Sequence, residues 1–268
     1  MEDNKIDIDA MFDMAQAEVF NRTIIDDTLE ARNIRMTQVI SKFASALTAR
    51  LINVSMSTSS DNPHHQGHTY AWSDAENIWF NKDAVKDLTN LDTVLAVKGM
   101  ALHEIGHILY TPRSSSNLFK WVKGNGYLLA FNMLEDQRLE LFLDAKYSNV
   151  KHWFSALVTK GILDNPEQIP YIYPIIHGRT FLPAELRMLI KQEYHDQSII
   201  ADIARIVDDY TVLNLSNSAH IPIAMKLIEE LHKLLQLNTN TPKTPPNSPR
   251  PNGSSPSQPR SEEHTSEL

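Results

Sequence analysis

The chain has 268 residues, 42% of them hydrophobic and 22% charged, which is enough to bury a core in one or two domains. Its formal net charge is −8 and it has no basic stripe, which argues against nucleic acid as the main partner. It has no cysteine, which excludes disulfides and thiolate metal sites and agrees with a reducing compartment. Any bound metal ion would therefore need histidine and carboxylate ligands.

The first nine residues are acidic and polar, and they lack the basic segment followed by an apolar stretch that marks a signal peptide. No apolar run approaches the roughly 20 residues that a membrane-spanning helix needs. The sequence therefore predicts a cytoplasmic protein with no membrane partner.

Residues 1–240 are expected to form the folded part of the chain. Residues 10–50 have apolar side chains spaced for one buried helical face. Three short strands should follow, because an alternating stretch and then two stretches around an Asp-Ala-Glu-Asn turn signal occur at residues 51–58, 68–73 and 77–81. The strands lead into a helix at about 92–110, so the predicted fold is α+β and mainly helical, with a small three-stranded sheet before this helix.

The helix at 92–110 contains His103-Glu104-Ile105-Gly106-His107, an H-E-x-x-H motif. Positions i and i+4 lie on the same helical face, so His103 and His107 can bind one metal ion. Glu104 can then act as a general base on water at that metal, as in zinc hydrolases. The apolar residues around the motif predict a buried helix. The alternative is a pair of core histidines satisfied by neighbouring hydrogen bonds.

A third ligand is expected from a second helix, at 127–147, which is apolar apart from a few acids. Asp136 is the favoured ligand and Glu135 is its rival. The alternative is a solvated charged face, which the scarcity of other polar residues makes less favourable. Strands, an H-E-x-x-H helix and a ligand helix together form the minimal layout of a zincin-like core, in which an edge strand beside the metal can bind an extended peptide.

Asn132, Asp136 and Glu140 follow the spacing i, i+4, i+8 and form one polar stripe on this second helix. Glu140 or Asn132 could therefore orient a ligand histidine from behind. Glu135 lies on an adjacent stripe, where it could pair with Arg138.

The pattern beyond the second helix predicts four more helices, at about 150–163, 183–194, 199–213 and 221–237. The loop 171–183 carries Tyr173, His177 and Arg179, which are candidates to stabilise an oxyanion or to contact substrate. A run of histidines at 64–68 lies in a polar segment and is expected to be a solvated loop outside the site.

From residue 241 the composition changes, and seven of the 14 prolines fall within 241–259. This stretch is expected to be a disordered linker rich in proline and serine. Residues 260–268 resemble the translation of a sequencing adapter. We therefore expect the natural protein to continue beyond the linker into a further C-terminal domain.

The chain resembles a group of metallopeptidases from bacteria and their phages in two paired motifs, Lys-Gly-Met-Ala-Leu-His-Glu-Ile-Gly-His-Ile-Leu-Tyr-Thr-Pro-Arg at 98–113 and Asn-Met-Leu-Glu-Asp-Gln-Arg-Leu-Glu at 132–140. The resemblance covers roughly residues 35–185. In that group a flexible linker leads to a von Willebrand factor A-like domain, and the group is similar to cobaltochelatase-subunit and nitric-oxide-reductase-activation proteins.

The resemblance implies that His103 and His107 are zinc ligands, that Glu104 is the base, and that Glu135 or Asp136 is the third ligand. It implies a zinc-dependent peptidase acting on a peptide or protein. The alternative is a non-catalytic accessory module, in which zinc stabilises a domain that acts with a C-terminal von Willebrand A-like domain and an AAA+ ATPase partner. Only the peptidase needs Glu104 and a metal accessible to water.

Overall fold

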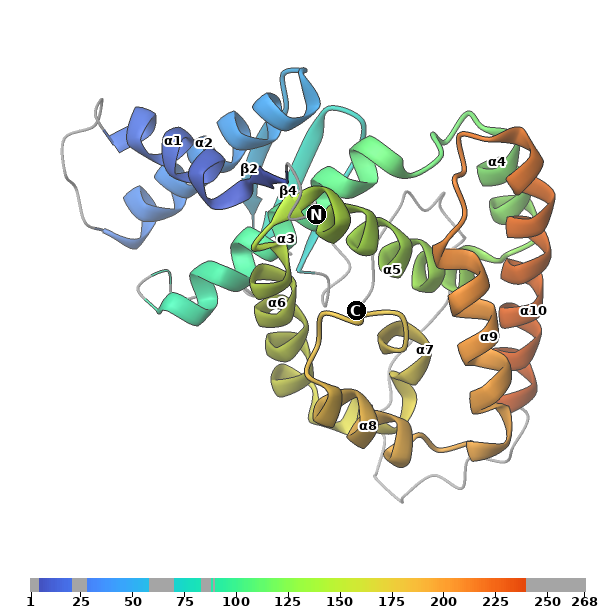
Figure 1. Cartoon of the computed structure of the whole chain (residues 1–268). Coiled ribbons are helices and arrows are strands. Elements are labelled where there is room, and N and C mark those ends of the chain that lie inside the picture. Colours follow the sequence, from blue (N-terminus) through green and yellow to red (C-terminus); the bar gives the residue numbers. More distant parts are fainter. Residues whose placement is uncertain (1–4, 21–27, 58–69, 83–87, 89, 240–268) are drawn as a thin grey trace, which may run out of the picture.

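The computed structural model describes residues 5–20, 28–57, 70–82, 88 and 90–239. The fold is mainly helical with two small sheets, which confirms the α+β prediction at that level (Figure 1). The histidine run at 64–68, the expected linker and the terminal segment lie outside the described residues.

The strands are β1 (Ile6–Asp7), β2 (Asn53–Ser57), β3 (Ala71–Ser73), β4 (Asn77–Asn81) and β5 (Tyr147–Ser148). The α-helices are α1 (Ile8–Phe20), α2 (Leu29–Thr48), α3 (Leu91–Tyr110), α4 (Asn117–Gly124), α5 (Leu128–Lys146), α6 (Val150–Asp164), α7 (Tyr173–Ile176), α8 (Ala184–Glu193), α9 (Ile200–Thr211) and α10 (Ile221–Thr239). Short 3₁₀ helices are η1 (Pro166–Tyr171), η2 (Gln197–Ile199) and η3 (Ser218–His220).

The larger sheet has the order β2-β4-β3, with β2 parallel and β3 antiparallel to the central strand. The predicted hairpin is confirmed. Its turn forms because Asp74 Oδ1 accepts hydrogen bonds from the backbone N–H groups of Glu76 and Asn77, both at 2.8 Å. β3 is an edge strand and packs beside α3, where Ser73 Oγ lies 3.4 Å from the backbone oxygen of Glu104.

A first hydrophobic core joins α1, α2, the larger sheet, α3 and α6. α3 and α6 approach each other closely in this core. A Cβ atom at Gly99 would lie only 2.5 Å from the backbone oxygen of Trp153, so only glycine allows the two helices to approach this closely. Trp153 itself packs edge-on against Phe12 of α1, with ring centroids 5.6 Å apart.

A second hydrophobic core joins α4, the first half of α5 and the helices α7 to α10. α5 belongs to both cores, because Phe131 and Leu134 lie in the second core and Leu139 and Leu143 in the first. Figure 1 shows α5 running from the side of α9 and α10 to the side of α3 and the sheet. Every residue in the range 134–140 is buried, so the middle of α5 is enclosed on all sides.

Most predicted helices are confirmed within a few residues, with three differences. The expected helical stretch 10–50 is two helices, α1 and α2. The loop 171–183 includes the short helix α7 at its start. α4 was not predicted, because its eight residues are too few to show a clear period, although Ser116 caps it by accepting from the N–H of Phe119 at 3.1 Å.

The two helices that carry the motifs differ from membrane helices in their polar content. α3 contains the H-E-x-x-H residues, and α5 has four charged residues in its buried centre. Within the described part of the chain, no helix is both long enough and apolar enough to cross a bilayer.

Candidate metal centre

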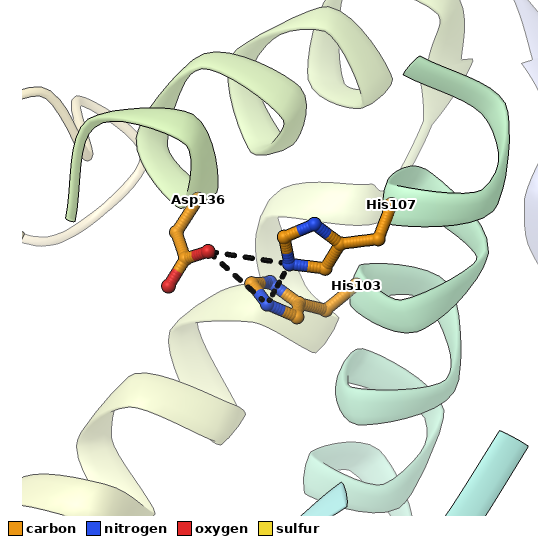
Figure 2. A group of neighbouring side chains, drawn as sticks. All are labelled: His103, His107 and Asp136. Carbon is orange, nitrogen blue, oxygen red and sulfur yellow. Dashed lines mark hydrogen bonds and ion pairs between the residues drawn. The ribbon is translucent and has the colours of Figure 1, made fainter. Parts of the chain in front are cut away.

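The side chains of His103, His107 and Asp136 converge where α5 crosses α3 (Figure 2). The two Nε2 atoms lie 3.1 Å apart, and Asp136 Oδ1 lies 3.2 Å from Nε2 of His107 and 3.7 Å from Nε2 of His103. Tetrahedral coordination with bonds of about 2.0–2.1 Å would separate the ligand atoms by about 3.3 Å. The three atoms therefore have the spacing of ligands around one metal ion.

Gly106, the fourth residue of the motif, sets how closely the two helices approach. A Cβ atom at Gly106 would lie 2.7 Å from Cδ1 of Leu139 and 2.9 Å from Cδ1 of Leu143. Both leucines are fully buried and have little room to move. Glycine at this position thus lets α5 lie against α3 and brings Asp136 within reach of the histidines.

The Nδ1 atom of each ring has its own acceptor. Nδ1 of His103 lies 2.9 Å from Oε1 of Glu140. Nδ1 of His107 lies 2.9 Å from Oγ1 of Thr111, whose hydroxyl donates to Oε1 of Glu135 at 2.9 Å. A hydroxyl has one proton, so Thr111 accepts from His107. When the rings are neutral, these acceptors hold them as Nδ1–H tautomers, and their Nε2 lone pairs point toward each other and toward Asp136.

Lone pairs and a carboxylate oxygen at these distances repel one another unless a cation or a proton lies among them. Burial opposes a charge on His103, but the carboxylates of Asp136, Glu140 and Glu104 outweigh it and raise the pKa of the ring to about 9. Burial also opposes ionisation of Asp136, yet the two histidines and Arg179 hold the pKa of its carboxyl below the ordinary value. The site therefore attracts positive charge.

The formal charges of the buried side chains indicate the valence of that cation. Glu104, Asp136 and Glu140 contribute three negative charges and Arg179 one positive charge, which leaves two negative charges with the histidines neutral. The neighbouring pair of Glu135 and Arg138 cancels internally. A divalent cation would neutralise the site, and buried charge is costly when it is not compensated.

Glu104 lies between the two ligand histidines in sequence and is 2% exposed. Its Oε2 atom is buried and has no hydrogen-bond partner among the described residues. Oδ1 of Asp136 is also buried without a hydrogen-bond partner among the described residues, although it lies within ion-pair distance of both histidines. Unsatisfied buried carboxylate oxygens are costly, so these atoms indicate a place for a ligand such as a metal ion or water.

The structure corrects the alternative that Glu135 is the third ligand. Its carboxylate accepts hydrogen bonds from Thr111, twice from Arg138 and once from the hydroxyl of Tyr210. A carboxylate has about four acceptor positions, so none is left for a metal ion. The predicted pair with Arg138 is confirmed.

Of the two residues predicted to orient a ligand histidine, Glu140 contacts His103 directly. Its carboxylate also accepts from Nε and Nη2 of Arg179, at 2.7 and 2.9 Å. Burial opposes ionisation of Glu140, but Arg179 and His103 hold its pKa below the ordinary value. Asn132 is half-buried on α5, one turn before Asp136.

The three predicted oxyanion candidates have different positions. The hydroxyl of Tyr173 lies 2.9 Å from Nδ1 of His177, and Nε2 of His177 lies 3.0 Å from Oδ1 of Asp208. These contacts connect α7 to α9. Arg179 instead reaches the ligand network through Glu140, and its Nη1 atom is buried without a hydrogen-bond partner among the described residues. Its guanidinium thus supports the residue that holds His103.

Sequence reasoning missed Thr111 as a partner of His107. The available signal is its position four residues after His107 and directly before Pro112, which ends the helix and turns Thr111 into extended backbone. The contact between Arg179 and Glu140 has no comparable signal, because the two residues lie 39 positions apart.

Metal binding is expected to release about one proton per site at neutral pH, because a ring whose pKa is about 9 is protonated there and must lose that proton to coordinate. Asp136 should release none, since its pKa is lowered. The apparent affinity should rise about tenfold per pH unit until the pH reaches the pKa of His103. Titration calorimetry in buffers of different ionisation enthalpy measures the released protons, and binding without proton release at pH 7 would contradict this expectation.

No family model, curated protein or solved structure matches the chain. The class of site is therefore defined by its own geometry. Within the described residues, two histidines and one aspartate form a largely buried group that can hold a metal ion.

Proposed function

We propose that this chain is a zinc-dependent peptidase with a zincin-like core. The observation that carries the proposal is the convergence of His103, His107 and Asp136, with the unsatisfied carboxylate of Glu104 belonging to the same helical turn. Two histidines and a carboxylate are a common ligand set of catalytic zinc sites. A purely structural zinc site would use four protein ligands, whereas this group provides three.

Zinc is favoured over other divalent cations by the donor set. Two imidazoles and one carboxylate suit zinc, whereas calcium and magnesium prefer oxygen ligands throughout. The distances of 3.1 Å between the two Nε2 atoms and 3.2 Å from Nε2 of His107 to Oδ1 of Asp136 also agree with the separation of about 3.3 Å that tetrahedral zinc geometry requires. When bound, the zinc ion supplies Lewis-acid polarisation of a substrate carbonyl and makes water more acidic at neutral pH.

The protein's own residues supply the proton transfers. In this proposal Glu104 takes a proton from the attacking water at Oε2 and then delivers it to the nitrogen of the leaving amine. Glu140 and Thr111 accept the Nδ1 protons of the ligand rings and keep the Nε2 lone pairs directed at the metal position. His107, whose side chain is 16% exposed, is the most exposed of the three ligands, so substrate would approach from its side.

A peptide substrate is supported by the edge strand beside the motif. β3 lies at the edge of the larger sheet, and Ser73 contacts the backbone of Glu104. An extended peptide can add to such an edge through main-chain hydrogen bonds, which would bring a scissile bond close to the metal site.

The proposal is tested with a quenched peptide library. Protein loaded with zinc should cleave it, protein stripped with a chelator should not, and adding zinc back should restore cleavage. Loss of activity on chelation without recovery would indicate unfolding or a contaminating protease. Stoichiometric zinc without any cleavage would contradict the proposal and favour the accessory module that acts with a von Willebrand A-like domain and an AAA+ ATPase.

A further inference from the structure

The end of α3 folds back on the second ligand histidine. Thr111 ends the helix in an extended conformation, with φ −74° and ψ 136°, as expected for a residue before proline. Its backbone N–H still donates to the carbonyl oxygen of His107, at 3.1 Å. The same residue therefore contacts His107 twice, through its backbone and through its hydroxyl at Nδ1.

The hydroxyl of Thr111 connects the His107 ring to a buried carboxylate. Nδ1–H of His107 donates to Thr111, and Thr111 donates to Glu135, with both distances 2.9 Å. A carboxylate behind a ligand histidine fixes the tautomer of the ring and increases its basicity. The ring of His103 contacts its carboxylate, that of Glu140, directly. The ring of His107 reaches its carboxylate, that of Glu135, through the hydroxyl of Thr111.

Glu135 is itself held by Arg138, which lies three residues later on α5, and by Tyr210 on α9. Arg138 donates to it from Nε at 2.8 Å and also donates to the backbone oxygens of Tyr110 and Leu213, at 2.9 and 3.4 Å. The hydroxyl of Tyr210 on α9 donates to the second carboxylate oxygen at 3.2 Å. Glu135, Arg138 and Tyr210 are almost fully buried, so the acceptor of the Thr111 proton cannot shift freely.

We propose that Thr111 is a positioning residue of the metal site, and that Glu135 acts on the metal through Thr111 and His107 rather than as a ligand. The role in catalysis rests on the proposed peptidase function. The role in metal binding does not, because it concerns only the orientation and tautomer of His107.

The test compares Thr111→Val with Thr111→Ser. Valine keeps the branched shape and removes the hydroxyl, and serine keeps the hydroxyl. The zinc dissociation constant, measured by competition with a chromophoric chelator, should rise about 10- to 100-fold in Thr111→Val and return to within about threefold of the native value in Thr111→Ser. The absorption spectrum of the cobalt-substituted protein should change in Thr111→Val alone, because the ligand geometry changes.

Thr211→Val is the matched control, because Thr211 is also buried and its hydroxyl donates to the backbone oxygen of Asp208, at 3.2 Å, outside the ligand network. Its zinc affinity should stay native. Native affinity in Thr111→Val, or equal losses in the valine and serine variants, would overturn the proposal. Zinc binding without peptidase activity would contradict only the proposed function and leave this comparison intact.

A measurement on the native protein covers the case in which Thr111→Val does not fold. In the zinc-loaded protein, nitrogen-15 NMR should show His107 as the Nδ1–H tautomer, with a slowly exchanging ring proton close to the Thr111 side chain. An Nε2–H tautomer at His107 would overturn the proposal.

Discussion

Glu104→Gln is expected to lower peptide turnover by about 10²- to 10⁴-fold, the usual contribution of a positioned general base. Glutamine has the same shape but cannot accept and return a proton. Because Oε2 of Glu104 has no hydrogen-bond partner among the described residues, the substitution should break no hydrogen bond of that atom. Zinc content and thermal stability should therefore stay close to native.

The measurement combines initial rates on a cleaved peptide with zinc analysis of the same samples. Glu193→Gln serves as the matched control, because Glu193 is exposed at the end of α8. It makes the same change of charge outside the site and should keep full activity. Equal rates in native and Glu104→Gln protein would show that another group is the base. Loss of zinc together with activity would show that Glu104 acts on metal binding instead.

Much of the site was predictable because its polar residues interrupt apolar patterns. His103 is buried and His107 is partly buried on a helix whose middle is buried, and imidazoles removed from water need a cation or hydrogen-bond acceptors. The acids of α5 stand out for the same reason. The small sheet and its hairpin were also predictable, since Asp74 and its neighbours form a turn by local hydrogen bonds alone.

The helical period favoured Asp136 over Glu135 but could not exclude Glu135. Neighbouring residues on a helix point about 100° apart, and both directions at this point of α5 are buried. The decision depends on tertiary contacts, because Arg138, Thr111 and Tyr210 occupy Glu135 and leave Asp136 to the histidines. For the same reason, the sequence offered Arg179 as an oxyanion donor when its main contact is Glu140.

The buried charges form a polar layer between the two hydrophobic cores. The histidines belong to α3 in the first core, whereas Arg179 and Tyr210 come from the chain around the second. α5 passes through both and carries the carboxylates between them. We propose that this charged layer helps to specify how the cores fit together, because a shift of α5 would separate Glu135 and Glu140 from the arginines that pair with them.

Arg179→Met is expected to lower the free energy of unfolding by about 3–5 kcal/mol, because it removes the guanidinium partner of the fully buried Glu140 and leaves only His103 beside that carboxylate. Methionine has a similar length and no charge. Glu140 has a lowered pKa in the folded protein, so its contribution to stability is present above its ordinary value of 4.5 and is lost as the pH falls. Without Arg179 the pKa of Glu140 should rise, and acid unfolding should begin at a higher pH.

Urea unfolding of metal-free protein measures the loss, so that zinc affinity does not enter. Arg205→Met is the matched control: Arg205 Nη2 lies 2.9 Å from Glu230 Oε2, but its side chain is 50% exposed. Removing that exposed pair should cost at most about 1 kcal/mol. A cost for Arg179→Met as small as that of Arg205→Met would mean that Glu140 is protonated or hydrated in the folded protein. In that case His103 would not be held by a charged carboxylate, and the divalent charge balance of the site would no longer hold.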